Sequence, residues 1–418
     1  MTKQNKLTPE LHFPEFTKSA AWEVKALEEI CDVYRGSTFS KADIDEKGSV
    51  FCIHYGELFT KYNEVISSVS SRTNKEDGFK SKVGDILMPS SDVTPDGLAK
   101  ASAIMIDDVV LGGDMNILRQ KGNSNSIFLS YLLNHSKSEI IKLVSGTTVK
   151  HIYPSQIITC QLPIAKVKSE QQKIASCLSS LDEVITAHSH KLELLKDHKK
   201  GLMQDLFPQE GEKVPKLRFM EFEGEWVEKT LETLTLKISD GIHTTPVYDV
   251  NGDYYFINGN NLVDGRILID EKTKRVSEDE YEKHKKELDG NTILLSINGT
   301  IGNISVYNNE KVILGKSACY ININETKTNK DFIIHFLQSE KVKQYFNSEL
   351  TGSTIKNLSL KSIKETIVQI PINPKEQQKI ASCLSALDKL ITAQAEKIEQ
   401  LKQHKKGLMQ GLFPKMND

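Results

Sequence analysis

Two regions of the sequence hold loops whose side chains could bind nucleic acid. The loops combine Gly with Asn, Ser, Thr, Arg, Lys and His, which hydrogen-bond phosphates and base edges. Ordinary turns use many of the same residue types, so each loop alone fits either interpretation. The candidates in residues 17–165 are Arg35, Ser37, Thr38, Lys41, Ser90, Ser91, Thr94, Lys150 and His151. Those in residues 223–372 are His243, Thr244, Thr245, Asn258, Asn260, Asn261, Asn298, Thr300, Ser353, Thr354, Lys356 and Asn357.

No catalytic motif accompanies these loops. The sequence has no G-x-x-x-x-G-K-[ST] phosphate loop and no G-x-G-x-x-G fingerprint. The Pro95-Asp96 pair lacks the second acid of a nuclease metal site at the usual spacing, and the histidines are scattered. We therefore expect no catalytic residue and no bound metal, which disfavours a methyltransferase or nuclease acting by itself.

The chain is an internal duplication. Residues 170–208 recur at 376–414 with 29 of 39 positions identical, at an offset of 206 residues. The segment 9–16 echoes 215–222 at the same offset, whereas the regions between have diverged. A nearly fixed element beside divergent regions predicts a shared structural role for the first and different ligands for the second.

Each copy of the repeat is predicted to form one long helix. Apolar residues recur at alternating steps of four and three, the heptad seam of a coiled coil. A single helix cannot bury such a stripe, so we expect the two helices to pack antiparallel with internal pseudo-two-fold symmetry. The residues expected in this packing are Ile174, Leu178, Leu181, Ile185, Leu192, Leu195, Ile380, Leu384, Leu387, Ile391, Ile398 and Leu401.

Polar residues interrupt the predicted seam at matching places in both copies. His188 and Gln394 correspond, as do Lys199 and Lys405. They either fix the register of the helices or lie where the coil splays. The surrounding basic stretch at 196–200 and 402–406 is equally open, since it could be a solvated face near a helix C-terminus or a contact to phosphates.

Helix start signals and composition together predict the domain organisation. Ser169-x-x-Gln172 has the pattern of a capping box, and Asn373 followed by Pro374 begins the second helix. The predicted segments are an N-terminal tail (1–16), a first variable region (17–165), a first repeat helix (166–208), a linker (209–222), a second variable region (223–372), a second repeat helix (373–414) and a C-terminal tail (415–418).

Both variable regions are predicted to be mixed α/β or α+β domains. Each combines short apolar runs between Gly and Asn turns with one amphipathic helix, expected at 127–144 and at 332–346. The predicted strands are 50–54, 85–88, 103–106, 254–257, 292–295, 301–306 and 318–323.

Composition limits the class of protein. The 418 residues carry 54 Lys and Arg against 56 Asp and Glu, a net charge of −2 that divides into −1 on each side of Pro208. This balance argues against coating nucleic acid by bulk charge, although a local basic surface remains compatible. No run approaches a membrane span or a signal peptide, so a cytoplasmic protein without membrane contact is expected. The six cysteines are scattered, as expected for reduced, mostly buried thiols.

The repeats resemble the specificity subunits of type I restriction–modification systems. The resemblance rests on the E-Q-x-x-I-A helix starts at 170–175 and 376–381, and on the G-L-M-Q-x-L-F-P ends at 201–208 and 407–414. The G-D-I-L strand start at 84–87 is also similar, and the domain–helix–domain–helix order extends the resemblance over essentially the whole chain.

The resemblance implies a non-catalytic reader of double-stranded DNA. In such subunits each variable region is a target-recognition domain for one half of a bipartite, asymmetric site, and the helices act as a spacer. The helices also dock two modification (methyltransferase) subunits, and restriction (translocase–nuclease) subunits complete the complex. S-adenosylmethionine, ATP and Mg2+ are expected on those partners and no cofactor on this chain. The docking candidates are Glu170, Gln171, Glu376, Gln377, Leu206, Phe207, Leu412 and Phe413.

A second hypothesis is a coiled-coil scaffold whose globular domains bind proteins or small molecules. It explains the repeats equally well but gives the polar loops no purpose. Salt-dependent DNA binding would favour the reader, because phosphate contacts release counterions, whereas its absence would favour the scaffold.

Overall fold

The computed structural model describes residues 7–19, 21–37, 39–122, 124–352 and 356–416. The chain divides into two compact units, Met1–Ser189 with Glu396–Asp418, and His190–Ala395. Each unit contains one variable region together with part of both long helices. The compact units therefore differ from the predicted segments, because the helix ends belong to the globular cores.

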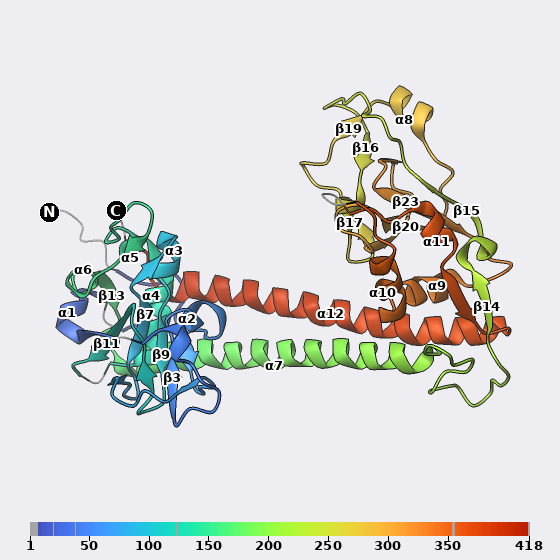
Figure 1. Cartoon of the computed structure of the whole chain (residues 1–418). Coiled ribbons are helices and arrows are strands. Elements are labelled where there is room, and N and C mark those ends of the chain that lie inside the picture. The colour runs from blue at the N-terminus through green and yellow to red at the C-terminus, as the bar shows by residue number, and fades with distance from the viewer. Residues whose placement is uncertain (1–6, 20, 38, 123, 353–355, 417–418) are drawn as a thin grey trace. The chain divides into compact units, whose positions relative to one another are not determined.

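Both repeats are helices of 39 residues, α7 (Lys168–Leu206) and α12 (Pro374–Leu412) (Figure 1). Within each unit the start of one helix packs against the end of the other, so the helices are antiparallel there. Lys405 of α12 pairs with Asp182 of α7 at 2.7 Å in the first unit. Lys199 of α7 pairs with Asp388 of α12 at 2.6 Å in the second. These matching ion pairs support the register interpretation of the polar seam positions.

The seam is fully buried mainly where the helix ends enter the globular cores. Ile174 and Leu178 join the core of the first unit, and Ile380 and Leu384 that of the second. Toward the helix centres, Leu387 and Ile398 are also buried. The other predicted seam residues are half-buried: Leu181, Ile185, Leu192, Leu195, Ile391 and Leu401.

The two predicted helix starts have different outcomes. The prediction for α12 is confirmed, since the helix begins at Pro374 and Asn373 Oδ1 accepts a hydrogen bond from the backbone N–H of Lys375 at 3.0 Å. The predicted capping box of α7 is wrong, because the helix begins at Lys168 and Ser169 therefore lies inside its first turn. Gln172 Oε1 instead accepts a hydrogen bond from Asn125 Nδ2 at 2.6 Å, which ties α7 to the first variable region.

The first variable region is built on a five-stranded sheet in the order β2-β11-β7-β9-β4, beside a four-stranded sheet in the order β5-β3-β10-β6. Its strands are β1 (Glu23–Ala26), β2 (Cys31–Arg35), β3 (Val50–Ile53), β4 (Val65–Ile66), β5 (Arg72–Thr73), β6 (Phe79–Lys80), β7 (Ile86–Pro89), β8 (Ser91–Asp92), β9 (Ser102–Ile104), β10 (Val110–Leu111), β11 (Met115–Gln120), β12 (Lys150–His151) and β13 (Gln161–Ile164). Its helices are α1 (Leu27–Ile30), α2 (Glu57–Thr60), α3 (Pro95–Leu98), α4 (Ser126–His135), α5 (Lys137–Ile141) and α6 (Pro154–Ile157).

The second variable region has a four-stranded sheet in the order β15-β23-β20-β21 and a three-stranded sheet in the order β19-β16-β22. Its strands are β14 (Val227–Thr230), β15 (Thr235–Asp240), β16 (Tyr254–Ile257), β17 (Leu262–Val263), β18 (Arg266–Ile267), β19 (Arg275–Val276), β20 (Thr292–Ser296), β21 (Ile304–Val306), β22 (Val312–Leu314), β23 (Ala318–Ile323) and β24 (Ile367–Ile370). Its helices are α8 (Glu278–His284), α9 (Lys330–Leu337), α10 (Glu340–Ser348) and α11 (Leu360–Lys364).

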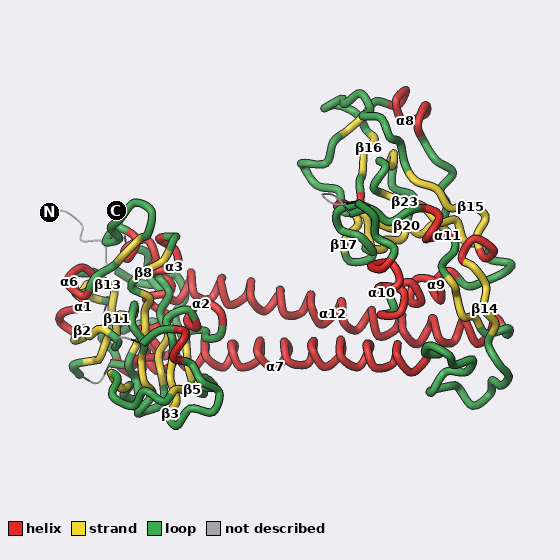
Figure 2. The backbone as a smooth tube through the Cα atoms, in the orientation of Figure 1, coloured by secondary structure: helices red, strands yellow, loops and turns green. Residues whose placement is uncertain are grey.

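The two regions share one topology despite their divergent sequences. Both combine short strands with short helices, as Figure 2 shows. The antiparallel order β2-β11-β7-β9 corresponds to β15-β23-β20-β21. The parallel pair β3 and β10 corresponds to β16 and β22, and the antiparallel pair β1 and β13 corresponds to β14 and β24. The duplication therefore includes the variable regions, and the predicted mixed α/β class is confirmed.

Each helix predicted inside a variable region is in fact two helices. The expected helix at 127–144 is α4 and α5, and the one at 332–346 is α9 and α10. A serine stands at each break, Ser136 and Ser339. The Ser339 side chain accepts a hydrogen bond from the N–H of Val342 at 3.4 Å, so it caps a new helix instead of continuing the old one.

An equivalent aromatic cluster anchors the end of a long helix in each unit. Phe413, one residue after α12, packs on Trp22 and Phe128 with ring centroids 6.2 and 5.6 Å away. Phe207, one residue after α7, packs on Trp226 and Phe332 at 6.3 and 5.4 Å. The helix ends are therefore part of the two hydrophobic cores.

Candidate nucleic-acid interface

The structure brings the polar loops of the second variable region together beside the β15-β23-β20-β21 sheet. Ile242 forms a bridge to Gly315, and Asn298 forms a bridge to Asn357. The N–H of Ile297 donates a hydrogen bond to the carbonyl of Ser317 at 3.0 Å. Segments far apart in the sequence, including those at 240–246, 258–261 and 297–300, thereby form one surface.

Several of the predicted binding residues position these loops. Thr300 Oγ1 donates to the Gly259 carbonyl at 3.1 Å. Asn258 Oδ1 accepts from Ser317 Oγ at 3.0 Å, and Asn261 Nδ2 donates to the Leu268 carbonyl at 3.0 Å. These three side chains are occupied by contacts within the chain, so their first role is to shape the surface.

Other candidates on this surface are exposed. Thr244, Thr245, Asn260 and Lys356 are exposed and Asn298 is half-buried. The His243 ring is exposed, and its Nε2 lies 2.8 Å from Asp240 Oδ2. Lys316 is also exposed, between the bridging Gly315 and Ser317, and sequence reasoning missed it. Its position in the short Gly315-Lys316-Ser317 turn, between two buried strands, would have indicated an exposed lysine on this surface.

The first variable region forms a corresponding surface with a different composition. In the β8–β12 ladder His151 faces Ser91 and Lys150 faces Asp92. The guanidinium of Arg35, at the end of β2, lies 5.8 Å from the centroid of the Tyr153 ring. The His151 ring stacks on the Tyr153 ring, with the ring centroids 5.9 Å apart and an interplanar angle of 13°. Tyr153 is 42% exposed and was not predicted, although its position two residues after His151 would have suggested it.

The remaining candidates of the first region have structural roles or lie elsewhere. Thr94 caps α3 and donates a hydrogen bond from Oγ1 to Asp92 Oδ2 at 2.7 Å. Ser37 Oγ accepts a hydrogen bond from the N–H of Phe79, and Ser90 is buried. Lys41 is exposed at the start of the short 3-10 helix Lys41–Asp43. The candidates outside the described residues are Thr38, Ser353 and Thr354.

The same pair of loops builds both surfaces. Ser145 bridges His151 in the first region, and Thr351 bridges Asn357 in the second, at the offset of 206 residues that relates the repeats. The loop that follows β7 meets His151, and the loop that follows β20 meets Asn357. The framework is therefore preserved, while the side chain at the junction changes from an imidazole to an amide.

The eight docking candidates at the helix ends are buried within the chain. Gln171 Nε2 donates to the Ala165 carbonyl at 2.7 Å, and Gln377 Nε2 donates to the Pro371 carbonyl at 3.0 Å. The exposed fractions of all eight residues are 4% or less: Glu170, Gln171, Glu376, Gln377, Leu206, Phe207, Leu412 and Phe413. Their side chains hold the chain's own domains on the helices.

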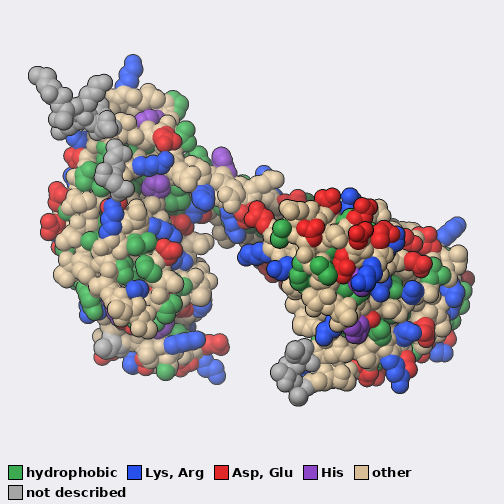
Figure 3. All heavy atoms as spheres, turned by 90° about the horizontal axis from the view of Figure 1, so that it is seen from above, with side chains coloured by type: hydrophobic (Ala, Val, Ile, Leu, Met, Phe, Trp, Pro, Cys, Tyr) green, Lys and Arg blue, Asp and Glu red, His purple; other side chains and the backbone are tan. Residues whose placement is uncertain are grey.

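Charge on the molecule is mixed. On the face shown in Figure 3, Lys and Arg side chains intermingle with Asp and Glu side chains over both units. The described residues contain no cluster of three or more His, Cys, Asp or Glu side chains that could hold a metal ion. None of the described helices is long and apolar enough to cross a membrane. All six cysteines are free thiols, and burial raises the pKa of Cys31 and Cys160 to about 12.

Known proteins with similar sequences point to one family. The family described as type I restriction modification DNA specificity domain matches twice, at residues 20–197 and 223–403. A putative type I restriction enzyme MjaX specificity subunit from Methanocaldococcus jannaschii is 27% identical over 410 residues, covering 93% of this chain and 92% of that protein. The type I restriction enzyme MjaVIII specificity subunit from the same organism is 26% identical over 387 residues, covering 85% and 84%.

Solved structures share the fold. The S subunit of a type I restriction–modification system from M. genitalium aligns with a TM-score of 0.64 at 18% identity, covering 98% of this chain and 100% of that one. A chain from a structure that describes complex assembly and conformational transition of the type I R-M system aligns with a TM-score of 0.53 at 14% identity, covering 94% and 97%.

Proposed function

Since the chain belongs to the family of type I restriction–modification DNA specificity domains, we propose that each variable region reads one half of a bipartite DNA site. The role of the chain is to supply sequence specificity rather than catalysis. The reading surfaces are the two loop junctions, around His151 and Arg35 in the first region and around Asn357 and Asn298 in the second. In this proposal α7 and α12 act as the spacer that sets the gap between the half-sites.

One observation carries this proposal. Equivalent loops meet at the same place in both regions, yet the residues at the junction differ between His151 and Asn357. Imidazole and amide groups make different hydrogen bonds to base edges, so one framework can read two different sequences. Lys150 and Lys356 occupy matching positions beside the junction and suit contacts to phosphate, which position the protein without reading sequence.

The partners in this proposal are double-stranded DNA, two modification subunits and the restriction subunits, with S-adenosylmethionine, ATP and Mg2+ on those subunits and not on this chain. The assembly would act in the cytoplasm. The helices offer a matching contact on both repeats, because Val184 and Leu390 occupy equivalent positions and are 43% and 57% exposed. An apolar residue exposed at the same place in each repeat is consistent with one modification subunit on each helix.

Methylome sequencing of cells that express the complete system tests the division of labour. Replacing His151 with Ala should change or relax only one half of the methylated sequence, and replacing Asn357 with Ala only the other half. Glu46→Ala, at an exposed residue of the first region outside the junction, is the control. A change of both halves by either single substitution, or of neither half by both, would contradict the assignment.

A deletion tests the spacer role. Removing residues 187–193 and 394–400 together takes one heptad from each helix and leaves both lysine–aspartate pairs in place. The helices shorten by about 10 Å, so the nonspecific gap should shrink by about 3 base pairs. A gap of unchanged length, with both half-sites retained, would exclude the spacer role.

A further inference from the structure

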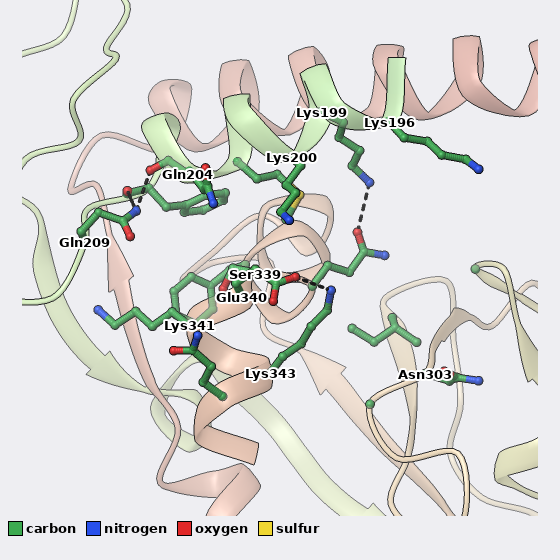
Figure 4. Close-up of a pocket in the computed structure, with 18 of the residues that line it drawn as sticks. Lys196, Lys199, Lys200, Gln204, Gln209, Asn303, Ser339, Glu340, Lys341 and Lys343 are labelled. Carbon is green, nitrogen blue, oxygen red and sulfur yellow. Dashed lines mark hydrogen bonds and ion pairs between the residues drawn. The ribbon is translucent and has the colours of Figure 1, made fainter. Parts of the chain in front are cut away.

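A pocket of about 720 Å³ lies in the second unit between α7, α10 and the loops around Asp264 and Asn303. Its most distinctive feature is its charge. Lys196, Lys199 and Lys200 line it from α7, and Lys341 and Lys343 line it from α10. Together these five residues define the lysine pocket, which Figure 4 shows in close-up.

The lysines outnumber the acidic groups. The acids that line the pocket are Glu210, Asp264 and Glu340. Glu340 is already paired with Lys343 at 3.0 Å. Lys200 has neither a hydrogen-bond nor an ion-pair partner in the part of the chain that the structure describes, and its side chain faces that of Lys343 across the cavity (Figure 4). Lysines therefore exceed acids among the residues that line the pocket, and Lys200 is the lysine that a bound anion would neutralise.

The lysines have different tasks. Lys199 is held by Asp388 at 2.6 Å and so belongs to the packing of the two long helices. Lys341 Nζ donates to Gln369 Oε1 at 2.8 Å. Lys196 is paired with Glu193 at 2.9 Å, on the exposed surface of α7. Lys200 is exposed four residues further along, so the two side chains lie on one side of the helix and can contact neighbouring anionic groups.

One wall of the pocket continues the candidate reading surface. Val263, Asp264 and Gly265 follow the loop at 258–261, and Gly302 and Asn303 follow the loop at 297–300. Asn303 Nδ2 donates to the Leu262 carbonyl at 2.9 Å, which joins these two segments. The segments that carry the reading loops therefore also line the lysine pocket.

We propose that the lysine pocket binds phosphate groups of the DNA backbone beside the half-site read by the second variable region. The inference rests on the proposed function and adds a contact from a repeat helix to the contacts of the variable region. Lysine ammonium groups suit phosphate because they act as mobile point charges, which position the duplex without specifying a base. The pocket would thus supply affinity for DNA although the chain as a whole has a net negative charge.

The test uses the assembled complex and the double variant Lys196→Gln with Lys200→Gln, which keeps long polar side chains in place. DNA binding is measured over a series of salt concentrations, and the methylated sequence is determined in cells. The matched control is Lys191→Gln with Lys229→Gln, which removes two exposed lysines of the same unit that do not line the pocket. The slope of log affinity against log salt should become shallower by about 2 in the pocket variant, whereas the control should keep the wild-type slope. Both variants should methylate the same DNA sequence as the wild type.

The outcomes separate the inference from the proposed function. A specific wild-type complex with an unchanged slope in the pocket variant overturns the inference alone. A wild-type complex that binds DNA without sequence preference overturns the proposed function. Calorimetry with inorganic tripolyphosphate tests whether the phosphate comes from another source. If the pocket variant loses tripolyphosphate binding but keeps the wild-type salt dependence of DNA binding, the pocket binds a free phosphate compound and the inference is overturned. Loss of subunit assembly in the variant would assign it to an acidic partner surface and also overturn the inference.

Discussion

The two units carry the same buried glutamate but satisfy it differently. Glu376, at the start of α12, receives hydrogen bonds from Arg218 Nε and Nη2, both at 2.8 Å, and from Trp226 Nε1 at 3.3 Å. Glu170, at the start of α7, receives the bond from Trp22 Nε1 at 3.3 Å, but His12 Nδ1 lies 3.9 Å away and Glu170 Oε2 has no hydrogen-bond partner. Burial raises the pKa of Glu170, with partial compensation by Trp22 and His12.

The same buried residue in the two repeats therefore has different partners, supplied by the segment that precedes each variable region. The sequences are the same for ten residues from Glu170 and from Glu376, and His12 and Arg218 occupy equivalent positions in the segments that precede them. A bidentate guanidinium compensates a buried carboxylate, whereas a distant imidazole does so weakly. Residues 7–16 of the predicted tail and 213–222 of the predicted linker are thus equivalent packing segments, and the second supplies the cation that pairs closely with the buried glutamate.

The largest expected effect comes from replacing Arg218 with His. This change gives the second unit the residue of the first and leaves Glu376 buried without its main partner, so we expect a loss of about 3 kcal/mol of unfolding free energy. The chain's two tryptophans allow each unit to be followed separately, since Trp22 lies in the first core and Trp226 in the second. Urea unfolding followed by Trp226 fluorescence in a Trp22→Phe background measures the effect.

The reciprocal change is its control. His12→Arg should stabilise the first unit by about 1 kcal/mol, because the guanidinium can reach the unpaired oxygen of Glu170. Trp22 fluorescence in a Trp226→Phe background reports it. If both substitutions changed the unfolding free energy in the same direction, the partners of the buried glutamate would not explain the difference in stability between the units.

The lysine–aspartate pairs between the helices give the next largest contrast. Lys405 contacts two carboxylates, Glu64 at 2.9 Å and Asp182 at 2.7 Å, and burial together with Glu64 raises the pKa of Asp182. Lys405→Met removes the cation from both carboxylates and leaves Asp182 only the hydrogen bond from the Tyr131 hydroxyl, so a loss of about 2 kcal/mol is expected in the first unit.

Lys199→Met is the matched variant in the second unit. Lys199 has one carboxylate partner, Asp388, whose side chain is 41% exposed, so the loss should stay below about 1 kcal/mol. The same single-tryptophan unfolding experiments compare the two variants. An equal loss in both units would mean that the additional carboxylate, Glu64, contributes nothing.

The large-scale architecture follows from the sequence because its signals are periodic or repeated. The heptad seam and the duplicated segments predict two long helices, and Asn373 with Pro374 marks the start of the second. The capping box fails because a Ser and a Gln at the right spacing also fit the first turn of a helix, where Gln172 binds Asn125. The strand expected at 301–306 begins only at Ile304, since Gly302 adopts a positive φ of 90° that turns the chain.

The candidate site is less predictable because it depends on contacts distant in sequence. Polar loops can be recognised one by one, but the pairing of Asn298 with Asn357, and of Ser91 with His151, requires the sheet topology. Tyr153 and Lys316 have no periodic signal. The helix-end candidates are conspicuous in the sequence because they repeat, and they repeat because each is buried in its own core.

Acidification should change the stability of the second unit by a smaller amount. Tyr131 and His335 occupy equivalent positions, six residues after the capping Asn125 and Asn329. Burial, with the nearby charge of Lys199, lowers the pKa of His335 from 6.5 to about 4, while its Nε2 lies 3.0 Å from Ser385 Oγ. The unfolded chain therefore binds a proton that the second unit excludes between about pH 6.5 and 4, so its stability falls as the pH is lowered through that range.

In the first unit Glu170 acts in the opposite direction, because its raised pKa means that protonation relieves a buried charge. Burial also lowers the pKa of His54 and His135 in that unit, and both oppose the contribution of Glu170 as the pH falls. Lowering the pH from 7 to 5.5 should cost the second unit about 1 kcal/mol through His335. Single-tryptophan urea unfolding at both pH values measures this. His335→Gln, which retains a partner for Ser385, should abolish the loss in the second unit. If that variant remains as acid-sensitive as the parent, the pH response has another origin and the exchange of Tyr131 for His335 is energetically silent.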